Sequence, residues 1–176
     1  MDIKNEELRD VCQEALECFR KMRKLDPLLN VNTAFATASY RIGSALLRQK
    51  LVSRAKRYFE EAIKILPSFA AAYNQLGVVY VNSGDLHKAE EQFKKVTERT
   101  ETNPNAKDEC RKACVNLGFI YNNKVEFQKA MVFLEKALEI DPSNAEVYNH
   151  IGIAKSGMGQ LTEAVSFFEM ALRLNP

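Results

Sequence analysis

The chain has 176 residues, of which 46% are hydrophobic and 27% are charged, and its net charge is +2. This apolar content excludes general disorder, and the near-neutral charge provides no overall field that would select nucleic acid as a partner. No apolar run is long enough for insertion into a membrane, and the charged N-terminal residues exclude an ordinary secretory signal. We therefore expect a soluble, cytoplasmic protein.

Residues 1–35 are predicted to form one helix followed by a linker. The helix has the spacing of the second half of a two-helix unit, with its first half missing or altered. The residues that carry this spacing are Ala15, Phe19, Met22 and Pro27.

A helix–turn–helix pattern then repeats four times over residues 36–176. Each copy has apolar or small residues at i, i+3, i+4 and i+7, which is one face of a helix, then a short break and a second such face. The predicted units are residues 36–69, 70–110, 111–144 and 145–176. One helical hairpin has too little core to be stable alone, so we expect the units to stack.

Small residues recur at one place on each predicted helix. They are Gly43, Gly77, Gly118 and Gly152 on the first helices, and Ala55, Ala89, Ala130 and Ala164 on the second. Glycine inside a helix costs about 1 kcal/mol relative to alanine, and close approach of the paired helices is the expected compensation. Gly118→Leu should therefore destabilise the protein by about 1–3 kcal/mol. Bulky residues are expected to fill the space between successive units: Phe59, Phe93, Leu134 and Phe168.

Helix starts are predicted at two further places. The second unit contains a seven-residue insertion within residues 100–110, which is about two helical turns and can lengthen a helix without rotating its face. Asn103-Pro104 suits a helix start, so we predict that the first helix of the third unit runs from about Pro104 to Asn122. Ser143 and Glu146 are predicted to form a capping box at the start of the fourth unit.

Residues that usually carry catalysis or bind metals form no convincing site. Cys110 and Cys114 share a helix face, but no histidine or second cysteine pair completes a zinc site, so we expect reduced core cysteines. His87 and His150 have no serine, cysteine or acidic partner at a telling spacing. The chain is therefore predicted not to be an enzyme, with no catalytic residue, metal or cofactor.

The spacing Leu-Gly-x-x-Tyr, then Ala-x-x-x-Phe, then Ala and Pro resembles the tetratricopeptide repeat. NQLGVVY with AEEQF, and VNLGFIY with AMVFLEKALEIDP, carry the resemblance most clearly. It covers residues 36–176, and weakly residues 7–27. It implies an all-α, right-handed solenoid of tandem antiparallel helix pairs that acts as a protein-binding scaffold or adaptor.

In this family the first helices of successive units line a concave groove. The resemblance places these residues there: Tyr40, Arg41, Arg48, Asn74, Gln75, Asn82, Lys112, Asn116, Phe119, Asn123, Asn149 and His150. Asparagine both donates and accepts hydrogen bonds, so this groove suits an extended peptide segment of a partner protein. Arg41 and Arg48 could receive a carboxylate. A concave face that is polar only because it is solvated explains the same residues equally well.

Two known uses of the family can be compared with this sequence. The chaperone-binding members hold a C-terminal carboxylate with lysine and asparagine residues spread over three units. Here Lys112 alone agrees in one alignment and Asn116 alone in another, so that clamp is absent. The asparagine ladder of a sugar transferase is closer in kind, although Asn74 and Asn149 lie one residue early.

Basic residues cluster around the turn of the first full unit: Arg48, Lys50, Arg54, Lys56 and Arg57. We expect a solvated turn that pairs with Glu60 and Glu61. No aromatic residues are interleaved with these basic ones as base stacking would need, so no nucleic-acid partner is expected.

An alternative function is self-association. Solenoids normally need a polar capping helix, and none follows the last predicted helix. Val165, Phe168, Ala171 and Leu172 are therefore expected to present an uncovered apolar face. The terminal helices would then form a homo-oligomer, or pack within a larger parent protein.

Overall fold

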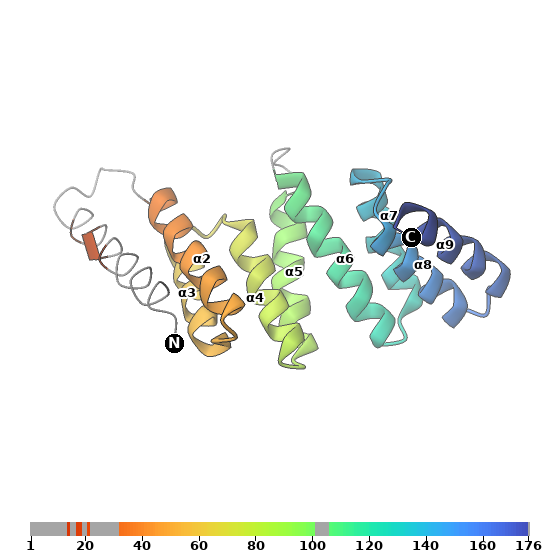
Figure 1. Ribbon diagram of the computed structural model, residues 1–176, viewed down its shortest axis with the longest axis horizontal. Coiled ribbons are helices and arrows are strands. Elements are labelled where there is room, and N and C mark those ends of the chain that lie inside the picture. Colours follow the sequence, from red (N-terminus) through yellow and green to blue (C-terminus); the bar gives the residue numbers. More distant parts are fainter. Residues whose placement is uncertain (1–13, 15–16, 19–20, 22–31, 101–105, 176) are drawn as a thin grey trace. The chain divides into compact units, whose positions relative to one another are not determined.

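The computed structural model describes residues 32–100 and 106–175, together with residues 14, 17, 18 and 21. The two long stretches form eight helices and no strand, which confirms the predicted all-α class. The helices are α2 (Asn32–Arg48), α3 (Val52–Ile65), α4 (Ala70–Asn82), α5 (Leu86–Thr100), α6 (Lys107–Asn123), α7 (Phe127–Ile140), α8 (Ala145–Gly157) and α9 (Leu161–Leu174) (Figure 1). The predicted half-repeat at the N-terminus lies outside the described residues. Among the described residues, no helix has the length and hydropathy to cross a membrane.

The chain divides into two compact units, residues 1–79 and residues 80–176, and the division falls inside α4. In the first unit α2 packs against α3. Ala36, Ala62 and Ala72 from α2, α3 and α4 form a buried core, because alanine on all three helices allows the backbones to approach closely.

In the second unit each helix packs against the next in the chain, from α5 to α9, and α6 also contacts α8. Five large side chains there are almost completely buried: Phe93, Leu117, Ile120, Leu134 and Ile151. Helical hairpins within this unit therefore share one apolar core, as the repeated pattern predicts.

Glycine on a first helix faces a bulky residue on the second helix of the same pair. A β-carbon added to the glycine would lie 2.7 Å from Phe59 at Gly43, 2.4 Å from Leu134 at Gly118 and 2.6 Å from Phe168 at Gly152. The glycines thus allow close approach, as expected. The bulky residues were expected to fill the space between successive units. These three instead contact the glycine of their own helix pair.

The turn inside each helix pair has one recurring backbone geometry. One residue has a positive φ: Lys50 at 61°, Gly84 at 79°, Val125 at 61° and Gly159 at 78°. The N–H of the next residue donates to the carbonyl five residues earlier: Leu51 to Leu46, Asp85 to Tyr80, Glu126 to Tyr121 and Gln160 to Lys155. This is the Schellman motif, which satisfies carbonyls left free at a helix end. Val125 is β-branched, so its left-handed conformation is strained.

Two predicted helix starts differ from the structure. Helix α6 has 17 residues and ends at Asn123, but it begins at Lys107, and Asn103-Pro104 lies outside the described residues. The predicted capping box is wrong, because Asn144 caps α8 by accepting a hydrogen bond from the N–H of Val147 at 3.2 Å. Ser143 instead donates to Asp141 at 2.8 Å. The helix begins one residue later than assumed, and asparagine is as good a cap as serine.

Candidate functional site

Tyr40, Asn74 and Asn149 occupy the same place in their units. At Tyr40 and Asn74 this place is one of helix packing, whereas Asn149 is exposed. The Tyr40 ring lies 6.0 Å from that of Phe59 and 5.3 Å from that of Phe69. Asn74 is only 4% exposed. The expectation that Asn74 is open to a partner is therefore corrected. The physical reason is the position of Asn74 on its helix: like Tyr40, it faces neighbouring helices and not an open groove.

Four predicted groove residues form one stripe along α6, which we call the α6 stripe: Lys112, Asn116, Phe119 and Asn123. The side-chain amides of Asn116 and Asn123 each donate to a backbone carbonyl four residues earlier, both at 2.9 Å. Each amide is thus held in one orientation, with its carbonyl oxygen and second N–H left for a partner. The two asparagines are seven residues apart, about 10 Å along the helix axis.

Lys112 is already neutralised by its own helix. Its Nζ lies 2.7 Å from Asp108 and 2.9 Å from Glu109. The hydrogen bond with Asp108 is the main cause that raises the pKa of Lys112 above its ordinary value. Lys112 therefore stays protonated, but a partner carboxylate would have to compete with two local ones.

The α6 stripe continues onto α8 through His150. The rings of Phe119 and His150 meet edge to face with centroids 5.9 Å apart, and Asn122 donates to the His150 carbonyl at 2.9 Å. Nε2 of His150 lies 3.9 Å from Glu146, and the nearby imidazole lowers the pKa of the Glu146 carboxyl. This corrects the interpretation that His150 has no acidic partner: the two are one helical turn apart.

The remaining predicted groove residues lie on α2 and α4. Arg41, Arg48 and Asn82 are exposed, and Gln75 is partly buried. Arg41 and Arg48 share α2, as their spacing predicts, and neither makes an ion pair within the described part of the chain.

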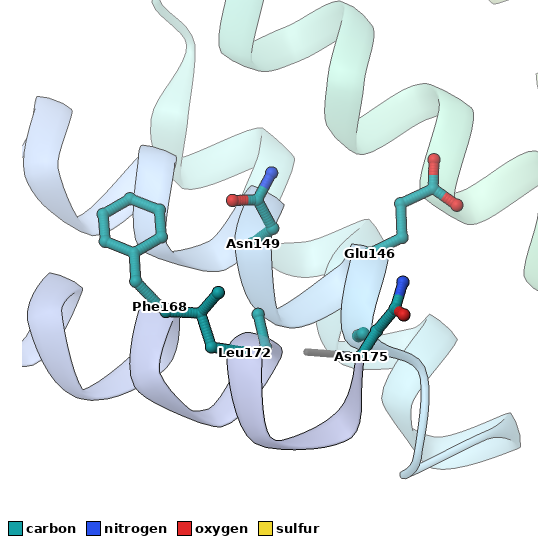
Figure 2. Close-up of a pocket in the computed structure, with 7 residues that line it drawn as sticks. Glu146, Asn149, Phe168, Leu172 and Asn175 are labelled. Atoms are coloured by element: carbon teal, nitrogen blue, oxygen red, sulfur yellow. The ribbon is translucent and has the colours of Figure 1, made fainter.

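A hollow of about 430 Å³ opens between α8 and α9 in the second unit. It is lined by Ala145, Glu146, Asn149, Phe168, Ala171, Leu172 and Asn175. Figure 2 shows Glu146 and Asn149 on α8, Phe168 and Leu172 on α9, and Asn175 directly after the end of α9. The hollow therefore combines an apolar surface with carboxylate and amide groups.

The same face one unit earlier is covered. The counterparts of Asn149, Phe168 and Ala171 are Val115, Leu134 and Ala137, which are at most 5% exposed, and α8 packs against both α6 and α7. The predicted uncovered face is confirmed for Val165 and Leu172, which are 56% and 65% exposed, whereas Ala171 is buried. Asn149 is one of the predicted groove residues, whereas Glu146 was not predicted here because its spacing indicated a capping role.

Glu90 on α5 is the centre of a polar cluster that the sequence pattern did not indicate. It accepts hydrogen bonds from Lys94 at 2.6 Å, from the Tyr121 hydroxyl at 2.7 Å, and from Lys124. Burial raises the pKa of Glu90, but these three hydrogen bonds outweigh it and lower the pKa to about 2. The cluster joins α5 to α6 and to the turn before α7. With its oxygens engaged, this carboxylate is a packing element rather than a general base.

Cys110 and Cys114 are 4% and 0% exposed and carry free thiols, which confirms their place in the core. Their mutual hydrogen bond, and then burial, raise the pKa of the Cys114 thiol. In the described ranges no group of three or more His, Cys, Asp or Glu side chains is arranged to hold a metal ion.

Comparison with known proteins gives consistent matches. Tetratricopeptide repeat models match residues 36–69, 112–144 and 133–166, and a model of the Est1 DNA/RNA binding domain matches residues 55–95. The cell division cycle protein 16 homolog of Homo sapiens is 30% identical over 122 residues, which cover 68% of this chain and 20% of that protein. The chain thus spans about a fifth of the length of this curated relative.

Solved structures show the same arrangement of helices. MamA has a TM-score of 0.68 at 24% identity, with 99% of this chain and 95% of that chain covered. BtubC from P. vanneervenii has a TM-score of 0.81 at 18% identity, with 98% and 73% covered. At these identities the likeness concerns the fold.

Proposed function

Because this chain is a tetratricopeptide repeat protein, a class that serves generally as a scaffold for protein interactions, we propose that it is an adaptor that binds an extended segment of a partner protein. In the second unit the proposed surface is the α6 stripe together with His150. Arg41, Arg48, Gln75 and Asn82 are the further candidates of the proposed groove.

The observation that carries this proposal is the fixed orientation of Asn116 and Asn123. A free asparagine side chain loses rotamer freedom when it binds, whereas these two are already held by their own helix. Their free carbonyl oxygens can accept backbone N–H groups of any sequence. Their separation of about 10 Å corresponds to about three residues of extended chain. Phe119, half-buried between them, offers an apolar contact.

Site-specific photo-crosslinking tests the surface. A photoreactive residue at Asn116 should capture a partner protein in native extract, and the same residue at Glu139, exposed on α7, should not. The captured protein is then used as the ligand. Asn116→Ala with Asn123→Ala should weaken its binding and leave thermal unfolding nearly unchanged.

Gln128→Ala is the matched control, because Gln128 is an exposed amide on α7. Loss of binding with the control alone, or a joint loss of binding and stability in the asparagine variant, would contradict the proposal. In the second case the asparagines are structural.

A second candidate is self-association through α9 and the hollow. It is favoured by the exposure of Leu161, Val165 and Leu172, at 64%, 56% and 65%. Sedimentation over a wide concentration range should then show a dimer that Leu172→Glu abolishes. Val132→Glu on α7 is the control, because Val132 is equally exposed at 64%. A monomer at every concentration excludes this candidate.

We also propose a cytoplasmic location and a role without catalysis. The buried free thiols of Cys110 and Cys114 suit a reducing compartment. Tetratricopeptide repeat proteins are generally scaffolds rather than enzymes, and the strongly shifted carboxylate, Glu90, is occupied by structural hydrogen bonds.

A further inference from the structure

Positive charge is concentrated in one part of the first unit. Residues 32–59 contain six basic residues and no acidic one, although the whole chain has a net charge of only +2. The six are Arg41, Arg48, Lys50, Arg54, Lys56 and Arg57. The rest of the chain therefore has four more acidic than basic residues. This segment comprises α2, the turn after it and the first half of α3.

Most of these cations are open and unpaired. Lys56 lies 3.7 Å from Glu60, but the other five make no ion pair within the described part of the chain. All five are exposed. The expected pairing of the cluster with acidic residues is therefore confirmed for Lys56, which lies near Glu60, but it does not extend to the other four residues of the cluster within the described part of the chain.

Helix stability does not account for the positions of Arg54 and Arg57. Arg54 lies in the first turn of α3, where the positive end of the helix dipole repels a cation, and α3 has no acidic residue in its first turn. Arg54 and Arg57 are three residues apart on one helix, so they also repel each other. These two charges oppose folding of α3 locally, whereas Arg48, in the last turn of α2, is favoured by the dipole of its helix. An anion bound beside Arg54 and Arg57 would relieve their repulsion.

Two aliphatic residues lie in the middle of this charge. Leu51 and Val52 are 40% and 38% exposed at the turn between α2 and α3. Lys50 precedes them with a φ of 61° in the Schellman turn, so the backbone that presents them is hydrogen-bonded rather than loose. We call the surface formed by Arg48, Lys50, Leu51, Val52, Arg54 and Arg57 the basic turn.

We propose that the basic turn binds an acidic segment of a partner protein whose aliphatic side chain packs on Leu51 and Val52. Carboxylates of that segment pair with the surrounding guanidinium and ammonium groups, and arginine can bind them in bidentate fashion. This surface lies in the first unit, and the proposal does not depend on the α6 stripe.

The chemistry of the basic turn favours acidic protein over nucleic acid. Single-stranded nucleic acid is held by exposed aromatic rings between basic groups. Within α2 and α3 as described, Phe35 and Phe59 are buried, Tyr40 is packed against Phe59 and Phe69, and Tyr58 is partly buried. The exposed apolar groups are aliphatic, which suits an acidic and aliphatic peptide.

Fluorescence anisotropy on the full chain tests the proposal. The probe is a labelled peptide of repeated Glu-Asp-Leu, and it is compared with poly-glutamate and with single-stranded RNA of the same charge. Arg48→Glu with Arg54→Glu should weaken peptide binding about tenfold or more at low salt, because two attractions become repulsions. Lys107→Glu with Arg173→Glu is the matched control, with the same charge change at exposed sites of the second unit, and should have little effect.

Leu51→Ser with Val52→Ser should reduce the preference for the leucine-containing peptide over poly-glutamate. Asn116→Ala with Asn123→Ala should leave peptide binding unchanged, which separates this surface from the α6 stripe. The proposal is overturned if the wild-type chain does not bind the peptide, or if both charge-reversal pairs act equally. Tighter binding of RNA that is lost with Arg48→Glu and Arg54→Glu would instead assign the surface to nucleic acid.

Discussion

Replacing Gly118 by alanine should destabilise the second unit, although alanine is the better helix former by about 1 kcal/mol. The added β-carbon would lie 2.4 Å from Cδ2 and 2.6 Å from Cγ of Leu134. Carbon atoms normally pack at about 3.5–4.0 Å, and Leu134 is completely buried with no room to turn away. Overpacking costs about 1–3 kcal/mol, and the better helix propensity offsets about 1 kcal/mol of that cost, so we expect a net loss of up to about 2 kcal/mol in the free energy of unfolding.

Gly152→Ala is the matched comparison. Its β-carbon would lie 2.6 Å from the Phe168 ring, but Phe168 lines the hollow beside α9 and its ring has space to turn. We therefore expect little or no loss of stability there. In addition, Gly118→Ala should cost less in a Leu134→Ala background, because the two side chains compete for the same space.

Urea unfolding followed by circular dichroism measures all four variants. The reasoning is refuted if Gly118→Ala raises the unfolding midpoint, since helix propensity would then outweigh packing. It is also refuted if Gly152→Ala lowers the midpoint as much as Gly118→Ala does. Additive effects of Gly118→Ala and Leu134→Ala would show that the close contact is not the cause.

Three further changes test the polar cluster, a turn and a cap. Glu90→Gln should lower the unfolding free energy by about 2 kcal/mol at pH 7, as measured by urea titration. Folding lowers the pKa of Glu90 from 4.5 to about 2, so the difference from wild type should shrink as the pH falls from 4.5 to about 2. Val125→Gly should raise thermal stability by about 1 kcal/mol by removing strain, whereas Val132→Gly inside α7 should lower it. Asn144→Ala should cost about 1 kcal/mol in the same assay and Ser143→Ala almost nothing, and the reverse order would restore the capping box.

The helix pairs could be predicted from the sequence because their determinants are local and repeated. Gly118 and Leu134 have counterparts at Gly152 and Phe168, and in each pair the small residue faces the large one. A period that recurs in phase reports both the helix faces and their partners. The starts of two helices were predicted less well than their faces. Helix α6 begins at Lys107, about three residues later than predicted, and α8 is capped by Asn144, one residue later than predicted. Shifts this small do not change the repeated pattern of apolar residues.

The candidate site was harder to predict because the exposure of a side chain depends on whether a neighbouring helix covers it. Asn74 is polar and lies in a first helix, yet its counterparts Tyr40 and Val115 pack inward, and comparing the three would have indicated burial. Asn149 has the same place and is exposed, since no described helix covers it. The Glu90 cluster joins residues about one unit apart and leaves no periodic signal.

The Schellman turns keep the same backbone geometry with different side chains. The hydrogen bonds that define the motif run between main-chain groups, so the motif does not require a particular side chain at its left-handed position. The four left-handed positions accordingly hold lysine, valine and two glycines. Such a corner can change its outward character from one hairpin to another while the hairpin itself stays the same, and a recognition surface placed there can be altered without rebuilding the protein beneath it.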